Sequence, residues 1–155
     1  MTPATAYADS SFLMSLAVED ANTEEAKRFM SRQPEPLPFN PLHRLEVRNG
    51  LRLRVHRGDI DAFRRTAALR QIEEDLEDGL LVHQAMPWTD ALRRAEQLSA
   101  DHAEQIGSRA ADTLHVAAAL LAEAQRFLSF DKRQRDLAKA AGLKVFPHAM
   151  PKQGG

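Results

Sequence analysis

Four acidic residues adjoin strongly apolar stretches of this chain, where a carboxylate is costly to bury. They are Asp9, Glu46, Asp112 and Asp131, beside the segments TAYA, PLHRLEV, TLHVAAALLA and RFLSF. Carboxylates that gather at low dielectric repel one another and lose hydration, so they protonate or recruit a cation. If folding brings these four together, a divalent metal site is the expected result.

Mg²⁺ and Mn²⁺ are the metal ions that suit such a site best. Both prefer hard oxygen ligands and keep several bound waters, so a carboxylate cluster favours them over zinc. Ions of this kind lower the pKa of a bound water, orient it for in-line attack on phosphorus and neutralise developing charge. The sequence has no cysteine and no hydrolase elbow, P-loop or HExxH motif, which disfavours nucleophilic side-chain chemistry.

Each acid also has a simpler interpretation. The chain has 22 acidic residues, and an aspartate after a strand is commonly only a helix cap. Glu46 on an apolar helix face and Asp112 before a buried helix make four independent coincidences the weaker explanation. The six histidines show no ligand spacing, and we interpret His115 as a core histidine satisfied by a hydrogen bond.

Strand and helix patterns alternate along the chain. We expect strands at 5–8, 80–85, 126–130 and 143–147. We expect a turn at 9–11 and helices at 12–18, 23–32, from 41, from 59 to about 79, 89–106, from about 109, and 132–141. This alternation predicts a mostly parallel sheet covered by helices on both faces. Ligands of such folds bind beyond the carboxyl ends of the strands, which Asp9 and Asp131 directly follow.

Local signals set the expected helix starts. Asn40 before Pro41 is a strong one, because asparagine accepts free amides of the first turn and proline suits the first position. We expect the later helices to be capped at Asp59, Thr89 and Ser108. In the helix from 41, one face is expected to carry Leu42, Leu45, Glu46, Asn49 and Leu53, so Glu46 should point inward.

Length and composition predict one soluble domain. The chain has 155 residues, of which 43% are hydrophobic, enough for one ordinary core. We expect a single domain over 1–148 and a disordered tail over 149–155. The longest apolar run, 116–122, is far below membrane-spanning length, and no basic leader or clear cleavage site precedes FLMSLAV, so a cytoplasmic protein is expected.

Charge is unevenly distributed although the net charge is only −1. From 44 to 70 there are eight arginines against three acidic residues. A solvated helix surface is one interpretation; phosphate or carboxylate recognition is the other, because the guanidinium fork matches both groups. The candidate residues for binding RNA or an acidic partner are Arg48, Arg52 and Arg64. Aromatic residues make up 6%, which disfavours base-stacking platforms.

Four segments carry a resemblance to a known family. They are YADSSFL at Asp9, PLHRLEVRNGL at Glu46, RAADTLHVAAAL at Asp112 and FLSFDKRQRDLAKAAGLKV at Asp131. In this order and spacing, over 7–146, they resemble a PIN-domain ribonuclease, and most of all the VapC-type toxins of bacterial toxin–antitoxin pairs. The longer lead at 1–6 departs mildly from the usual pattern.

The resemblance implies a fold, an activity and partners. The fold would be a PIN-like three-layer α/β/α sandwich with a mostly parallel sheet of about four to five strands. The activity would be Mg²⁺- or Mn²⁺-dependent cleavage of RNA, inhibited by a cognate antitoxin protein and frequently carried by a homodimer. Carried over residue by residue, Asp9, Glu46, Asp112 and Asp131 would be the acidic quartet, and Ser11 the hydroxyl that accompanies the first aspartate.

A second class of function stays open. The chain could be a non-catalytic α/β PIN-like scaffold or signalling module that binds a metal and a protein partner. A receiver-like module would need a phosphorylatable aspartate at the end of a central strand, and LLVHQAMP offers none. The intact quartet argues against a degenerate scaffold.

Overall fold

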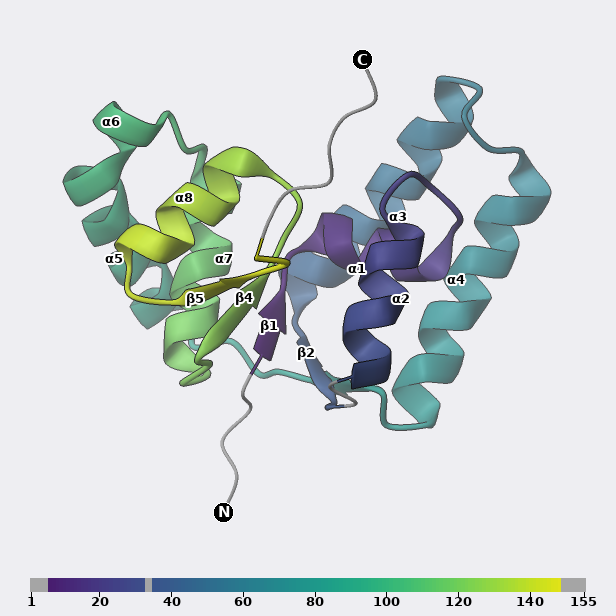
Figure 1. The fold of residues 1–155 in the computed structure, drawn as a ribbon, viewed down its shortest axis with the longest axis horizontal. Coiled ribbons are helices and arrows are strands. Elements are labelled where there is room, and N and C mark those ends of the chain that lie inside the picture. The colour runs from purple at the N-terminus through teal and green to yellow at the C-terminus, as the bar shows by residue number, and fades with distance from the viewer. Residues whose placement is uncertain (1–5, 33–34, 149–155) are drawn as a thin grey trace. The chain divides into compact units, whose positions relative to one another are not determined.

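The computed structural model describes residues 6–32 and 35–148, which form two compact units (Figure 1). The terminal unit comprises 6–9 together with 86–148, and the middle unit comprises 10–32 and 35–85. The chain therefore leaves the terminal unit after Asp9 and returns to it at Met86. Thr5, where the first strand is expected to begin, and the predicted tail at 149–155 lie outside the described residues.

The terminal unit holds a parallel sheet of three strands in the order β1, β4, β5. These strands are β1 (Ala6–Ala8), β4 (Arg126–Leu128) and β5 (Lys144–Phe146). Its helical segments are α5 (Trp88–Leu98), the π-helical turn η1 (Ser99–Ala103), α6 (Glu104–Ile106), α7 (Ala110–Leu121) and α8 (Lys132–Ala140).

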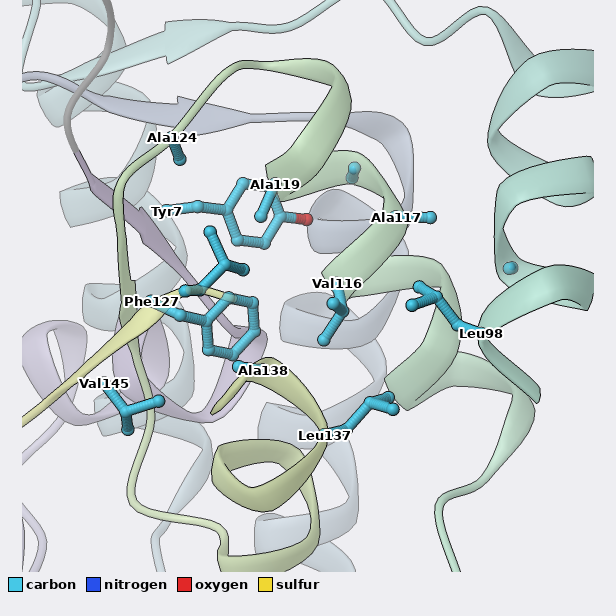
Figure 2. Close-up of a cluster of buried hydrophobic side chains, with 13 residues drawn as sticks. Tyr7, Leu98, Val116, Ala117, Ala119, Ala124, Phe127, Leu137, Ala138 and Val145 are labelled. Atoms are coloured by element: carbon cyan, nitrogen blue, oxygen red, sulfur yellow. The ribbon is translucent and has the colours of Figure 1, made fainter. Parts of the chain in front are cut away.

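One face of this sheet builds the core of the terminal unit. Tyr7 pairs in register with Phe127, and Phe127 with Val145, so these three side chains lie on the same face. They join the buried side chains of α7 and α8, among them Val116 and Leu137 (Figure 2). The Tyr7 hydroxyl lies 2.7 Å from His115 Nδ1. His115 is buried, which confirms its interpretation as a hydrogen-bonded core histidine.

The middle unit holds a parallel pair of strands, β2 and β3. Its elements are α1 (Ser10–Ala17), α2 (Thr23–Arg32), β2 (Leu37–Phe39), α3 (Pro41–His56), α4 (Ala62–Glu77) and β3 (Leu81–His83). The expected start of α3 is confirmed: Asn40 Oδ1 accepts a hydrogen bond from the His43 backbone N–H at 3.0 Å. His43 Nδ1 in turn accepts the Asn40 backbone N–H at 3.1 Å.

Strand β2 was not predicted, because its sequence, LPF, lies in a proline-rich stretch. Proline lacks an N–H and is normally excluded from paired strands. Here the Leu37 N–H donates to the Leu80 carbonyl, and the Phe39 carbonyl accepts from the Gln84 N–H. Alternate residues of a strand turn their backbone groups toward the same neighbour, so the nitrogen of Pro38 faces away from β3 and no hydrogen bond to β3 is lost.

Several expected helix starts are wrong by a few residues. Helix α1 begins at Ser10, so no turn separates it from Asp9. Helix α4 is capped by Asp61, whose carboxylate accepts the Arg64 N–H at 2.8 Å, and not by Asp59. Ile60, between these two aspartates, is buried and precedes the helix.

Two residues of the terminal unit that were predicted to cap helices do not do so. Thr89 lies inside α5, which begins at Trp88 and has no side-chain cap. The residue before α7 is Arg109 and not Ser108, and the buried Ser108 hydroxyl has no hydrogen-bond partner in the described part of the chain.

The buried face of α3 differs from the expected one. Its buried residues are His43, Val47 and Leu51, whereas Leu45 is 66% and Leu53 45% exposed. Leucines lie on more than one side of this helix, so their spacing alone did not select the buried side. The polar residue on that side, His43, is tolerated because its ring nitrogen accepts the Asn40 N–H.

The α/β class with parallel strands is confirmed. The strands found in the described residues are divided into sheets of three and two, one sheet in each unit, where one sheet of four to five strands was expected. In the two stretches that the structure describes, no helix combines the length and the apolar character needed to cross a membrane.

Candidate active site

Asp9 lies at the carboxyl end of β1, in the terminal unit. Its backbone N–H donates to the Leu128 carbonyl at 3.0 Å and so extends the pairing of β1 with β4. The residue is only 5% exposed. The Ser129 hydroxyl donates to Asp9 Oδ2 at 2.5 Å. A short hydrogen bond from a hydroxyl to a carboxylate fixes the orientation of this buried side chain.

Ser129 connects two of the predicted site residues. Its Oγ donates to Asp9 and accepts the Asp131 backbone N–H at 3.0 Å. Its own N–H donates to the Phe146 carbonyl at 3.1 Å, next to the end of β5. The serine is fully buried. One hydroxyl group therefore ties the residue after β1 to the residue that opens α8.

Arg135 holds Ser129 from the side of α8. Its Nη1 donates to the Ser129 carbonyl at 2.9 Å and its Nη2 to the Pro147 carbonyl at 2.6 Å. The residue is 4% exposed. Burial lowers the pKa of the Arg135 guanidinium below its ordinary value. The buried arginine thus fixes the two loops that follow β4 and β5.

Asp112 and Asp131 lie at the starts of the helices α7 and α8. Asp112 Oδ2 accepts the Arg109 backbone N–H at 2.8 Å, and Asp131 Oδ1 accepts the Gln134 backbone N–H at 3.0 Å. Carboxylates are favoured there by the partial positive charge of the helix N-terminus. Each keeps its other oxygen, Asp112 Oδ1 or Asp131 Oδ2, without a hydrogen bond to the residues at 6–32 and 35–148.

These two aspartates share an open cleft of about 380 Å³ in the terminal unit. Its other lining residues are basic: Arg109, Lys132 and Arg133. Lys132 Nζ forms an ion pair with Asp136 at 2.7 Å. Carboxylate oxygens and cationic groups therefore line the same cleft, which suits a ligand that carries both a metal ion and negative charge.

Glu46 and Ser11 belong to the middle unit. Glu46 is partly buried on α3, and its Oε1 accepts a hydrogen bond from the Ser10 hydroxyl at 2.8 Å. Ser10 is buried and Ser11 is exposed. The hydroxyl that contacts a predicted site acid within this unit is therefore that of Ser10, which the sequence interpretation passed over in favour of its neighbour.

The arginines predicted to bind RNA or an acidic partner also lie in the middle unit. Arg48 pairs with Glu73 at 2.8 Å, and Arg44 pairs with the same carboxylate at 2.9 Å. Arg52 donates to the Arg48 carbonyl at 3.5 Å, and the side chain of Arg64 forms no ion pair with any residue that the structure describes. Part of the positive charge of this segment is therefore neutralised locally.

Three of the four predicted acids thus belong to the terminal unit. Asp9 and Asp131 are linked through Ser129, and Asp131 and Asp112 line one cleft. Within the described stretches, no three His, Asp or Glu side chains are grouped closely enough to hold one metal ion. Ser129 was missed by the sequence interpretation, although a serine at a strand end two residues before Asp131 was a usable signal.

Comparison with known proteins supplies the family. The PIN domain family matches residues 6–140. The fold is similar to the solved structure of VapC20 from Mycobacterium tuberculosis, described as a sarcin–ricin loop cleaving toxin, with a TM-score of 0.64 and 21% identity over 92% of this chain and 100% of that one. It is also similar to FitAcB from Neisseria gonorrhoeae, with a TM-score of 0.61 and 15% identity over 94% of this chain and 100% of that one.

Among curated protein sequences no relative matches. At these identities the two solved structures establish the fold alone. The family match, in contrast, begins with the first residue of β1 and ends with the last residue of α8. Because it spans most of the sequence, the chain belongs to the PIN domain family.

Proposed function

We propose that this chain is a metal-dependent endoribonuclease and the toxin of a toxin–antitoxin pair. The observation that carries the proposal is the Ser129 hydroxyl, which links the buried carboxylate of Asp9 to the start of the helix that carries Asp131. An aspartate that only caps a helix would not need this link, because its carboxylate has only to accept N–H groups from the first turn of that helix. Membership of the PIN domain family supports the same function.

The acids of this chain fit Mg²⁺ or Mn²⁺ by their chemistry. All are hard oxygen donors, and Asp112 and Asp131 line the cleft and each keep one oxygen without a hydrogen bond to the described residues. Mg²⁺ is commonly bound by only one or two carboxylates, with waters and substrate phosphates completing its shell. Two cleft carboxylates therefore suffice, even though no three acidic side chains are grouped within the described stretches.

We assign Asp9, Asp112 and Asp131 as metal-binding residues, and Glu46 by its motif alone. A bound ion would activate a water for attack on phosphorus and stabilise the negative charge that develops. The residues of the chain prepare the site for this role. Ser129 holds the Asp9 carboxylate in one orientation, and the amides of α7 and α8 hold one oxygen each of Asp112 and Asp131.

The partners follow from the same family. VapC20 is described as a sarcin–ricin loop cleaving toxin. We propose RNA as the substrate of this chain, with a cognate antitoxin protein as its inhibitor, a homodimer as its assembled form and the cytoplasm as its location. Ser11, Arg48, Arg52 and Arg64 keep their predicted roles in this proposal.

Replacing Asp9 tests the proposal. Asp9→Asn removes the charge of the buried carboxylate and retains its shape, so we expect Mn²⁺-dependent RNA cleavage to fall by more than about 100-fold, beyond the loss typical of outer-shell residues. Growth arrest on expression should disappear with it. Purified wild type and variant are compared on total RNA with Mn²⁺ and with EDTA. Asp59→Asn, an exposed acid paired with Arg57, is the matched control.

Two results would contradict the nuclease assignment. One is a wild-type protein that cleaves no RNA with either metal, and the other is an Asp9→Asn variant as active as the wild type. Either result, with the variant folded by circular dichroism, favours the non-catalytic scaffold.

A further inference from the structure

We propose that the cleft of the terminal unit is a binding site for the phosphates of the RNA backbone, with Arg109 and Arg133 as its anion-binding residues. This inference rests on the proposed function and names the residues that hold its substrate. It places the main RNA contact in the terminal unit, whereas the sequence directed attention to the arginines of the middle unit.

The lining of the cleft carries more positive than negative charge. Its lining residues comprise three basic and two acidic side chains, so its walls are net positive in a chain whose net charge is −1. A metal ion on the two aspartates would add to this positive charge. A concave surface of this sign attracts a polyanion such as RNA and holds it through its phosphates.

Two of the basic side chains that line the cleft are available to bind a ligand. Lys132 is engaged with Asp136. The side chains of Arg109 and Arg133 form no ion pair and no hydrogen bond with any residue that the structure describes. An arginine fork without a carboxylate partner is free to bind two phosphate oxygens at once. A solvated surface arginine is the ordinary alternative, but two such residues here share a cleft with two predicted metal ligands.

Both arginines are held next to acids of the proposed site. Arg109 precedes α7, and its backbone N–H is bound by the Asp112 carboxylate at 2.8 Å. Arg133 is the second residue of α8, two positions after Asp131. Each arginine is therefore anchored at a helix start that also carries an acid of the site. A phosphate bound by the arginines would lie beside the carboxylates, and not on a remote surface.

The arginine-rich segment of the middle unit is less suited to this role. The carboxylate of Glu73 accepts both Arg44 and Arg48, and Arg54 pairs with Asp20 at 3.2 Å. Binding a phosphate would require these pairs to break or to be shared. We therefore expect the cleft arginines to contribute more to RNA affinity than Arg48 does.

The experiment measures RNA binding apart from cleavage. The full chain with Asp9→Asn serves as the uncleaving parent, and a fluorescent single-stranded RNA with Mg²⁺ serves as the probe. Anisotropy titrations over a range of NaCl concentrations give the affinity and its salt slope. Adding Arg109→Gln and Arg133→Gln should weaken binding about tenfold at low salt and reduce the slope by about 0.7 for each phosphate that the variant no longer neutralises.

The matched control changes the same charge elsewhere in the same unit. Arg93 and Arg94 are exposed on α5 and do not line the cleft. The pair Arg93→Gln and Arg94→Gln should change the affinity and the slope much less than the cleft pair. Thermal melts of both double variants should match the parent, because all four side chains are exposed.

The outcomes separate this inference from the proposed function. If the cleft pair affects binding no more than the α5 pair while the wild type cleaves RNA, the phosphate site is wrong and the nuclease assignment stands. If the parent binds no RNA, the phosphate site is also wrong. If the wild type in addition cleaves none, the proposed function fails with it.

Discussion

At the scale of single residues, the Ser129 hydroxyl is the contact that links two of the predicted acids in the terminal unit. It is buried, it donates to one predicted metal ligand and it accepts the backbone N–H of another. A hydroxyl offers one donor and two acceptor positions, so this serine serves both neighbours at once. Its contribution to activity would be made through Asp9, which makes it a positioning residue.

Removing this hydroxyl should lower the rate of RNA cleavage and leave the RNA affinity almost unchanged. We expect Ser129→Ala to lower RNA cleavage about 10- to 100-fold at saturating RNA, as loss of an outer-shell partner does. Apparent RNA affinity should change little, because the arginines of the cleft remain. Ser129→Thr, which keeps the hydroxyl, should recover much of the rate. A Ser129→Ala enzyme whose KM rises while its kcat is unchanged would contradict the positioning role.

The positions of the acids were accessible to sequence reasoning, and their partners were not. Asp9 after a strand and Asp112 in the first turn of a buried helix follow from local patterns, and the structure places both as expected. The bond from Ser129 to Asp9 joins residues 120 positions apart, which no local pattern encodes. Whether these acids bind a metal together stays a prediction.

At the scale of elements, Arg135 connects α8 to the ends of two strands. Its two Nη groups reach the carbonyls of Ser129 and Pro147, which follow β4 and β5. Lysine carries one compact ammonium group and cannot reproduce a planar fork that spans two acceptors. A carbonyl left unpaired in a buried position costs about 1–3 kcal/mol.

We therefore expect Arg135→Lys to lower the free energy of unfolding by about 1–3 kcal/mol. Urea denaturation followed by circular dichroism measures this difference, with the exposed Arg94→Lys as the control. Equal midpoints for the two variants would show that the buried guanidinium is not needed to hold the strand ends.

The helices were easier to predict than their boundaries. The span of α2, Thr23–Arg32, and the start of α3 agree with the expected ones, because acidic first turns, Asn40 and Pro41 act locally. The cap of α4 was predicted at Asp59 and lies at Asp61, and Ile60 between them is buried, a tertiary contact that the local sequence does not reveal. Strand β2 could have been predicted only with the knowledge that the nitrogen of Pro38 faces away from its partner strand β3.

At the scale of the whole molecule, the chain passes from the terminal unit to the middle unit directly after one of the predicted acids. Asp9 is the last residue before the middle unit and Ser10 is the first residue within it. Helix and strand alternation predicted parallel strands, but it did not predict their division into two sheets, because sheet partners are chosen by long-range packing. The single domain expected over 1–148 stays a prediction.

Metal binding should be visible in the stability of the whole protein. A ligand that binds only the folded state contributes RT ln(1 + [L]/Kd), about 2.7 kcal/mol at a hundredfold excess over Kd. For a chain of this length that corresponds to a rise in Tm of about 5–10 °C. Wild type should therefore gain clearly more from millimolar Mn²⁺ than Asp112→Asn, in which the proposed ligand has lost its charge.

The Asp112→Asn variant suits this measurement because its fold should be intact. An asparagine oxygen can still accept the Arg109 N–H that Asp112 Oδ2 accepts, so the start of α7 is retained. In EDTA the variant and the wild type should thus melt at similar temperatures. Asp90→Asn, an exposed acid on α5 with the same charge change, is the control and should respond to Mn²⁺ as the wild type does. Equal Tm shifts in all three proteins would mean that Mn²⁺ does not bind at Asp112, and the carboxylates of the cleft would lose their proposed role.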